Sequence, residues 1–385
     1  MYTKEQLNDL YERVVKDIDI SDALFDAAEQ EYMALGSWIE RQTPTYKVSI
    51  YPQGSFALGT VNKPVKGTDD YDLDLVCEFE EQYGLSARVL KRSVVKPLLE
   101  RYRKTKGEIE EKRRCWHVEY EDVPQFHTDV IPAVCRDRYI DITDYDGEND
   151  CYEYIGSNPK GYVKWFRERM AVRQHALREQ YCLMHSDSIK SQADIEALKE
   201  YHYKTPLQKA IQLLKRHRDV MFEGDTKHLK PISIIITTIA AELYNNEDNI
   251  VDTLVSILTQ AEKYIRDHKV GEEFHIDNPS YTGGDTENFA DKWNEHPERA
   301  AAFLGWLNQA RIDLISTKLY GFDRVKMADN IKISLGKVTC DRVFAQMAQE
   351  ERRSMEAQQR KIDPKTGSIT ESGSIPIPRS HHYGA

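Results

Sequence analysis

The stretch Gly67–Phe79, GTDDYDLDLVCEF, contains four aspartates within six positions and ends in an apolar run. Side chains of a strand alternate between its two faces, so Asp72 and Asp74 share one face and the apolar residues around them share the other. Two carboxylates whose Cα atoms are about 6–7 Å apart on one face repel each other unless a cation lies between them. The stretch therefore predicts a strand whose polar face binds divalent metal ions, with Asp69 and Asp70 as charges of the preceding loop.

Candidate partners for this strand lie on both sides of it in the sequence. Upstream, QGSF (Gln53–Phe56) contains a glycine that lets the backbone approach an anion, and Ser55 offers an N–H and a hydroxyl. Downstream, Asp129 lies within the apolar segment HTDVIPAV, where a charge is costly unless it is paired or bound to metal. Three aspartates on adjacent strands beside a Gly-Ser turn are typical of two-metal phosphoryl transfer, because Mg²⁺ prefers oxygen ligands and two ions can hold the attacking and leaving oxygens.

The composition restricts the classes of protein to be considered. The chain has 385 residues, 40% hydrophobic and 30% charged, which suits one large or two medium-sized domains. No segment approaches the roughly 18 consecutive apolar residues of a membrane span, and the N-terminus has no apolar signal core. Six scattered cysteines form no CxxC pair, so we expect reduced thiols, no structural zinc site and a cytoplasmic location. The net charge of −11 disfavours a protein that coats nucleic acid.

Periodicity predicts a mixed sheet followed by helices. Helices are expected over residues 3–42 and 86–104. Strands are expected over residues 47–51, 71–79, 115–123 and 126–134. From Ser157 onward helices dominate, and the clearest begins at the N-cap Thr205, with Pro206 at the first helical position and Gln208 completing a capping box. After about Lys361 the chain is rich in Ser, Gly, Pro and Thr, which predicts a flexible tail.

The combined motif GS…DYDLDLV…HTDVIPAV resembles the polymerase-β-like nucleotidyltransferases. Within them the chain resembles the cGAS/DncV-like nucleotidyltransferases (CD-NTases) of the bacterial CBASS anti-phage systems. Four more stretches carry that closer similarity: SNPKGYVKWF, TPLQKAIQLLKRHRD, KPISIIITTIAAELY and NPSYTGGDTENFADKW. Together these stretches extend from about Tyr51 to Leu314, so the resemblance covers most of the chain.

The resemblance implies an α+β fold. A catalytic lobe with a mixed β-sheet and a long N-terminal helix would pack on a C-terminal helical lobe, with the active site in the cleft between them. On this basis we expect the catalytic lobe over 1–155, the helical lobe over 156–350 and the flexible tail over 351–385.

The resemblance also implies roles for individual residues. Asp72 and Asp74 would bind two Mg²⁺ ions, for which Mn²⁺ is an alternative, and Asp129 would complete the site of the ion that activates the attacking ribose hydroxyl. The nucleotide-binding residues would be Gln53, Gly54 and Ser55 on the catalytic lobe, and Lys215 and Ser233 on the helical lobe.

Several of these positions have a structural alternative. Lys215 belongs to a basic cluster that solvent could cover, and Ser233 could simply cap a helix. Tyr71 and Tyr281 are equal candidates for stacking on a base. His127 is expected to be a packed or exposed strand residue, because metal-bound hydroxyls need no dedicated histidine.

The implied activity is the joining of two or three nucleoside triphosphates, purines with ATP included, into a cyclic di- or trinucleotide. Each step would release pyrophosphate, and the product would be a second messenger that activates an effector in anti-phage defence. Because no cysteine cluster is present, activation by long nucleic acid is not expected. The terminus HHYGA resembles tails that a ubiquitin-transfer-like partner conjugates to target proteins, with a plain disordered end as the alternative.

Two other functions use the same residues. A template-independent transferase acting on RNA or protein would need the same three aspartates and a continuous basic groove. A degenerate, nucleotide-binding regulator would not need them intact, and Asp72, Asp74 and Asp129 are all present.

Overall fold

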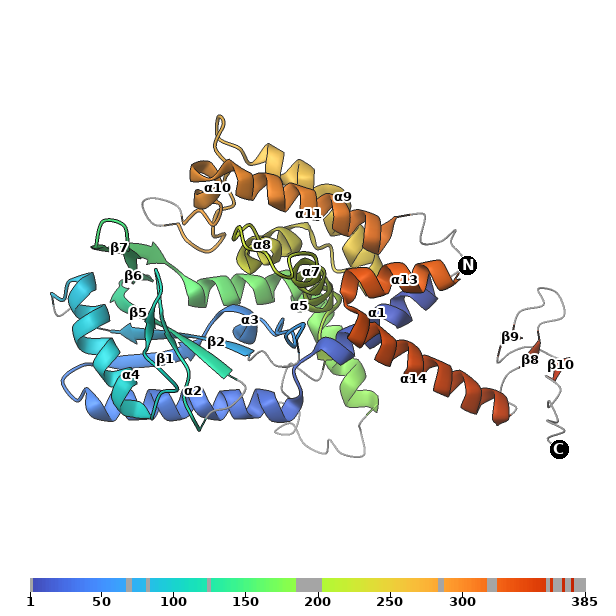
Figure 1. Ribbon diagram of the computed structural model, residues 1–385, viewed down its shortest axis with the longest axis horizontal. Helices are drawn as coiled ribbons and strands as arrows, with labels where there is room; N and C mark the ends of the chain where they lie inside the picture. Colours follow the sequence, from blue (N-terminus) through green and yellow to red (C-terminus); the bar gives the residue numbers. More distant parts are fainter. Residues whose placement is uncertain are drawn as a thin grey trace.

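The computed structural model describes residues 3–66, 71–80, 84–122, 126–184, 203–282, 287–316 and 324–357, and three two-residue strands further on. A mixed β-sheet with its own helices lies beside a bundle of helices (Figure 1). The predicted α+β class is therefore confirmed. Among the described residues, no helix is both long enough and apolar enough to cross a membrane.

The sheet is built around two parallel central strands. The strand order is β1–β2–β5–β4–β3, and β6 pairs with β5 and then with β7. Among the strand pairs of the described residues, only β2 and β5 run parallel, with Asp74 opposite Asp129 and Asp72 opposite His127. The bounds are β1 Val48–Pro52, β2 Tyr71–Phe79, β3 Glu110–Glu111, β4 Trp116–Val118, β5 Phe126–Arg136, β6 Tyr139–Asp146 and β7 Cys151–Ser157. Three predicted strands are confirmed, the strand expected over 115–123 is shorter, and β6 and β7 were not predicted.

One face of the sheet is covered by the helices that precede and interrupt it, and we call this unit the sheet lobe (22–157). The long helix α2 (Asp22–Gln42) runs along the sheet beside β1, and its Ala28, Leu35 and Ile39 share one buried core with the apolar residues of β2 (Figure 1). Its first turn is capped by the Ser21 hydroxyl, which accepts a hydrogen bond from a backbone N–H. The remaining helices here are α3 Gly54–Ala57, the π-helix η1 Val89–Val95 and α4 Lys96–Tyr102.

The second unit, the helical lobe, is centred on α7 (Pro206–Met221). The predicted capping box is confirmed: the Thr205 hydroxyl accepts from the Gln208 N–H, and the Gln208 side chain accepts from the Thr205 N–H. Leu207, Ile211 and Leu214 on α7 are completely buried or nearly so. The surrounding helices are α5 Pro159–Met184, α8 Ser233–Leu243, α9 Ile250–Asp267, α10 Asp291–Glu295, α11 Pro297–Ile315, α13 Arg324–Leu335 and α14 Lys337–Glu356.

The first helix, α1 (Lys4–Ile18), belongs to the helical lobe although it opens the chain. Its apolar stripe, which includes Leu7, Leu10 and Val14, is part of the same core as α7, α9 and α11. The Tyr11 hydroxyl donates a hydrogen bond of 2.8 Å to the carbonyl of Leu314 at the end of α11. The predicted division at residue 155 is corrected by this packing, because it grouped α1 with the sheet.

The predicted start of the tail at residue 351 also needs correction, because α14 continues to Glu356. Beyond it, β8 (Lys361–Ile362) pairs with β9 (Ile369–Thr370) and with β10 (Ile375–Pro376), all antiparallel. The terminal HHYGA lies outside the described residues. All six cysteines are free thiols.

Candidate active site

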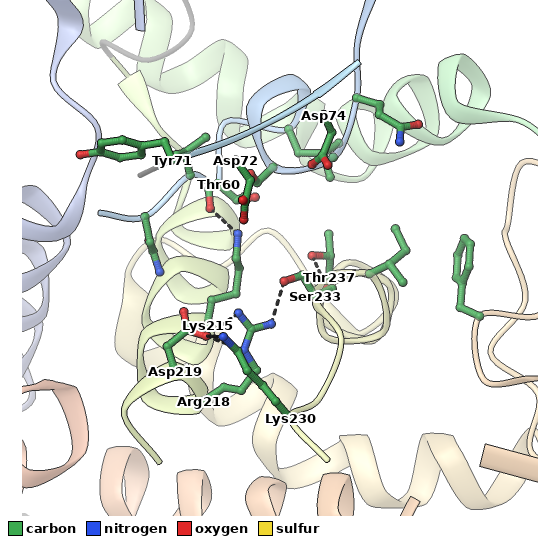
Figure 2. A pocket seen from close by; sticks show the side chains of 18 of the residues that line it. Thr60, Tyr71, Asp72, Asp74, Lys215, Arg218, Asp219, Lys230, Ser233 and Thr237 are labelled. Atoms are coloured by element: carbon green, nitrogen blue, oxygen red, sulfur yellow. Dashed lines mark hydrogen bonds and ion pairs between the residues drawn. The ribbon is translucent and has the colours of Figure 1, made fainter. Parts of the chain in front are cut away.

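A cavity of about 690 Å³ lies between the two lobes (Figure 2). Acidic side chains of β2 approach it from the sheet lobe, and cationic side chains of α7 approach it from the helical lobe. All of the predicted nucleotide-binding residues line the cavity, together with two of the three predicted metal ligands: Gln53, Gly54, Ser55, Lys215 and Ser233, with Asp72 and Asp74.

The Gly-Ser turn packs directly against the acidic strand. Gly54 has φ +58°, a conformation that glycine adopts without strain, and it opens the single turn of α3. A Cβ atom at this position would overlap the Asp74 carboxylate oxygen. The Gln53 N–H donates to the Asp74 carbonyl at 2.9 Å and so joins the turn to β2. Glycine is therefore required here for both its backbone angle and its lack of a side chain.

The two aspartates of β2 crowd one another as the alternation predicts. Burial, followed by the neighbouring charges of Asp72 and Asp129, raises the pKa of Asp74 to about 7. Lys215 and Lys112 act in the opposite direction but do not offset these effects. A carboxyl group with a raised pKa releases its proton when a cation binds beside it, so the site favours a positively charged ligand.

Asp129 is adjacent to this pair but does not line the cavity. It lies beside Asp74 in the parallel β2–β5 register. One carboxylate oxygen is 2.5 Å from Nδ1 of His117 on β4, and the same oxygen is 3.8 Å from the Lys112 ammonium. The structure thus brings the three predicted aspartates together and places a histidine against the third, which the sequence did not predict.

The opposite wall of the cavity is positive. The Lys215 ammonium is buried and donates to the Thr60 carbonyl at 2.8 Å. Burial, followed by the charge of Arg218, lowers the pKa of Lys215 to about 8. Figure 2 shows Lys215 pointing from α7 toward Asp72. The alternative that Lys215 belongs to a solvated cluster is therefore wrong.

Arg218 is a further residue of this wall. Its guanidinium donates to the Ser233 hydroxyl at 2.7 Å and to Asp219 at 2.7 Å (Figure 2). Ser233 is the first residue of α8 and its N-cap is Ile232, so the helix-cap alternative for Ser233 is wrong. The spacing of three residues from Lys215 to Arg218, which puts both on one face of a helix, is the sequence signal that identifies Arg218.

The remaining candidates separate into two groups. Tyr71 lines the cavity, whereas the ring of Tyr281 lies 4.6 Å from that of Tyr139. His127 is a strand residue of intermediate exposure, as predicted. Asp69 and Asp70 lie outside the described residues.

Comparison with known proteins agrees with this geometry. Residues 48–132 match the family model of the nucleotidyltransferase domain of cyclic GMP-AMP synthase DncV-like proteins. A c-di-GMP synthase of Roseivirga ehrenbergii is 30% identical over 315 residues, which cover 79% of this chain and 78% of the relative. The chain belongs to the CD-NTase family. This CD-NTase is therefore a nucleotidyltransferase, and the predicted class of activity, synthesis of a cyclic oligonucleotide, is confirmed.

A further relative of this CD-NTase, from Bradyrhizobium diazoefficiens, is similar both in sequence and in solved structure. The cyclic dinucleotide synthase CdnG is 26% identical over 298 residues, which cover 72% of this chain and 68% of that protein. The structure of CdnG in complex with GTP superposes with a TM-score of 0.68 at 22% identity, over 88% of this chain and 97% of that one. The predicted polymerase-β-like fold is confirmed by this similarity. The family uses divalent metal ions, and Asp72 and Asp74 present carboxylate oxygens to the cavity, with Asp129 adjacent to them.

Proposed function

We propose that this CD-NTase joins two purine nucleoside triphosphates into a cyclic dinucleotide, with GTP as a substrate. The observation that carries the proposal is the opposition, across one cavity, of Asp72 and Asp74 on β2 to Lys215 and Arg218 on α7. The choice of GTP is supported by the relatives, one named a c-di-GMP synthase and another solved with GTP. ATP, expected from the family resemblance, is the other purine to be tested.

We further propose that two Mg²⁺ ions bind here, with Asp72 and Asp74 contacting both and Asp129 contacting one; Mn²⁺ is an alternative. The residues fit hard cations, because every donor is a carboxylate oxygen and the raised pKa of Asp74 reflects repulsion that a cation would remove. When bound, the ions supply acidity to the attacking ribose hydroxyl and neutralise the departing pyrophosphate.

The protein side chains position the substrates and neutralise their charge. Gly54 and Ser55 allow the triphosphate to approach the backbone beside β2. Lys215, Arg218 and Lys230 provide positive charge on the opposite wall, where a triphosphate carries most of its negative charge. Binding in the cavity excludes bulk water from the reacting groups, which strengthens these electrostatic interactions.

The product is proposed to act as a second messenger that activates an effector in anti-phage defence, as expected for CBASS proteins. Conjugation of the C-terminal tail by a ubiquitin-transfer-like partner remains a proposal of the same kind. Both follow from the family and not from a contact within the protein.

The proposal is tested by incubating the protein with each labelled triphosphate, and with pairs of them, in the presence of Mg²⁺. After phosphatase treatment, mass analysis should detect a resistant species with the mass of a cyclic purine dinucleotide. The double variant Asp72→Asn, Asp74→Asn should produce none, and Asp146→Asn, an exposed aspartate of β6, should retain the activity. Labelled product that is linear, or attached to added RNA or protein, would refute the proposal and favour the template-independent transferase.

A further inference from the structure

The polar face of the sheet carries a second set of donor side chains beyond the three aspartates. In the antiparallel β4–β5 register, His117 lies opposite Asp129. Continuing the same register by two residues places Glu119 opposite His127, and these two side chains are 3.7 Å apart. Because alternate residues of a strand share a face, all four side chains lie on the same face as the aspartates of β2.

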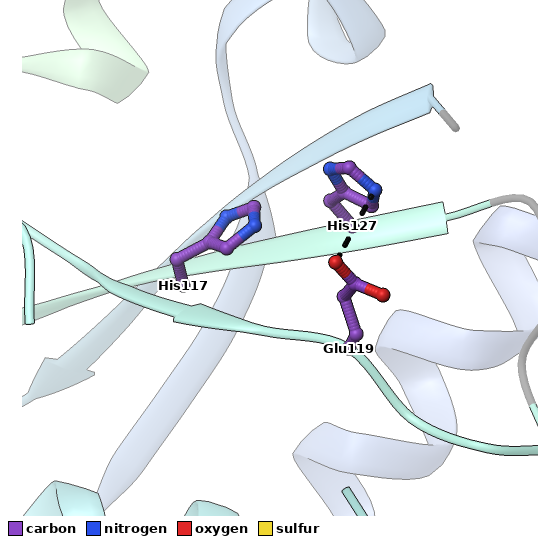
Figure 3. Close-up of side chains that lie close together, drawn as sticks. All are labelled: His117, Glu119 and His127. Atoms are coloured by element: carbon purple, nitrogen blue, oxygen red, sulfur yellow. Dashed lines mark ion pairs between the residues drawn. The ribbon is translucent and has the colours of Figure 1, made fainter. Parts of the chain in front are cut away.

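His117, Glu119 and His127 have donor atoms within 4.8 Å of one another (Figure 3). Two imidazoles and one carboxylate are the protein ligands of a common class of open zinc site, in which the fourth position is left to water. Metal–nitrogen distances of about 2.0–2.1 Å require donors about 3.3–3.5 Å apart in a tetrahedral site. Donor pairs up to 4.8 Å apart must therefore close by up to about 1.5 Å. The side chains of Glu119 and His127, 37% and 27% exposed, have room to rotate.

A separate observation favours His117 as a ligand. Its Nδ1 is 2.5 Å from Asp129, and in the tautomer with the proton on Nδ1 the ring donates that proton to Asp129 and leaves the Nε2 lone pair available to a metal ion. A histidine whose second nitrogen is bonded to a carboxylate is the usual arrangement around protein-bound zinc, because the carboxylate fixes the ring orientation and increases the basicity of the ligand. Figure 3 shows the His117 ring turned toward the other two residues.

We propose that His117, Glu119 and His127 bind one transition-metal ion of the Zn²⁺ class, distinct from the Mg²⁺ ions proposed for the cavity. The donor atoms distinguish the two metal sites: imidazole nitrogen selects Zn²⁺ and similar ions, whereas carboxylate oxygens alone suit Mg²⁺. Asp129 takes part in both sites: it is the hydrogen-bond partner of His117 and, according to the proposed function, a ligand of one Mg²⁺.

The bound ion would join β4 to β5 at the level of Asp129. β4 has only three residues, and its contact with β5 is what holds His117 against the aspartate. Ligands on both strands fix their register, so the ion should stabilise this edge of the sheet in proportion to its occupancy. The ion also keeps His117 in the tautomer that donates to Asp129.

The site is tested with Zn²⁺ and Co²⁺ on the full chain, with no nucleotide present. Titration against a chromophoric chelator in excess Mg²⁺ should show one bound Zn²⁺ per chain, and Co²⁺ should give the strong visible absorption of a tetrahedral site. We expect His127→Gln and Glu119→Gln each to weaken Zn²⁺ binding at least about tenfold, and Asp129→Asn to weaken it about 10–100-fold through His117. The melting temperature should rise with Zn²⁺ in the wild-type protein and less in these variants.

Two controls make the result specific. His275 also lies near two carboxylates, Glu273 at 3.8 Å and Asp277 at 3.4 Å, so His275→Gln is a matched change that should leave Zn²⁺ binding unaltered. Asp72→Asn, Asp74→Asn should also retain Zn²⁺, even though it is expected to lose turnover. The proposal is overturned if Zn²⁺ binding is absent, survives the His127 and Glu119 variants, or is displaced by Mg²⁺. None of these outcomes depends on cyclic dinucleotide synthesis, so the two proposals fail independently.

Discussion

Asp74→Asn is expected to increase the stability of the nucleotide-free protein while abolishing its activity. The carboxyl group of Asp74 has its pKa raised from an ordinary value of 3.8 to about 7, first by burial and then by the charges of Asp72 and Asp129. A raised pKa means that the folded protein binds the proton more tightly than the unfolded chain does. The stabilisation from this proton is complete below pH 3.8 and is lost as the pH rises through about 7.

The size of the effect follows from the shift. A difference of about three pKa units corresponds to about 4 kcal/mol between the two ends of this pH range. Asp74 borders a cavity accessible to water, which screens part of the repulsion, so about 1–2 kcal/mol is the expected loss of unfolding free energy. Because asparagine has nearly the same shape as aspartate but no charge, the variant should not lose this unfolding free energy as the pH rises.

The assay is urea unfolding of the wild-type protein and Asp74→Asn in EDTA at pH 5.0 and pH 8.0. The stability advantage of the variant should grow by about 1–2 kcal/mol between the two pH values. Asp146→Asn is a control of opposite sign, because hydrogen bonds from Asn149 and the Glu148 N–H lower the pKa of Asp146. Its loss should therefore cost the same stability at pH 5.0 and pH 8.0, because both lie above the ordinary aspartate pKa of 3.8. An advantage of Asp74→Asn that is the same at both pH values would refute the reasoning.

Three further changes test other parts of the structure. Gly54→Ala should cost about 1–3 kcal/mol of stability and abolish turnover, because its Cβ meets the Asp74 carboxylate at a strained φ. Gly305→Ala in the open middle of α11 should instead gain up to about 1 kcal/mol in the same denaturation assay. Lys215→Met should weaken binding of a non-hydrolysable GTP analogue about 10–100-fold, as measured by calorimetry. Lys209 lies on the same helix but forms an ion pair with a glutamate of α1, so Lys209→Met should change this affinity less than twofold. Trp306→Phe should cost about 1–3 kcal/mol in urea unfolding, because the indole N–H donates to a buried histidine of α7 at 3.1 Å; an unchanged midpoint would contradict that role.

The parts of the site that depend on local geometry were predictable from the sequence. The alternation in β2 placed Asp72 and Asp74 on one face, and the backbone requirements of the turn identified Gly54. The capping residues of α7 fixed where that helix begins, and therefore which residues of it face the cavity.

The rest depended on contacts between distant segments. The pairing of β4 with β5 places His117 against Asp129, and no local pattern specifies which strands become neighbours. Arg218 was part of a basic cluster whose burial is decided by the packing of α7 against α8 and not by the sequence of α7. The strands β6 and β7 were not predicted; β6 alternates between buried and partly exposed residues only over its first four positions, and most of β7 is partly exposed.

The position of α1 in the helical lobe has a consequence for synthesis of the chain on the ribosome. The helix leaves the ribosome long before the helices against which its apolar stripe packs, α7, α9 and α14, the first of which begins at Pro206. At about 5–20 residues per second, the nearly 190 intervening residues take roughly 10–40 s to emerge. During that interval the sheet lobe can fold, while α1 must wait with its apolar side uncovered. Co-translational chaperones are therefore expected to bind α1, and release from them to coincide with the emergence of α7.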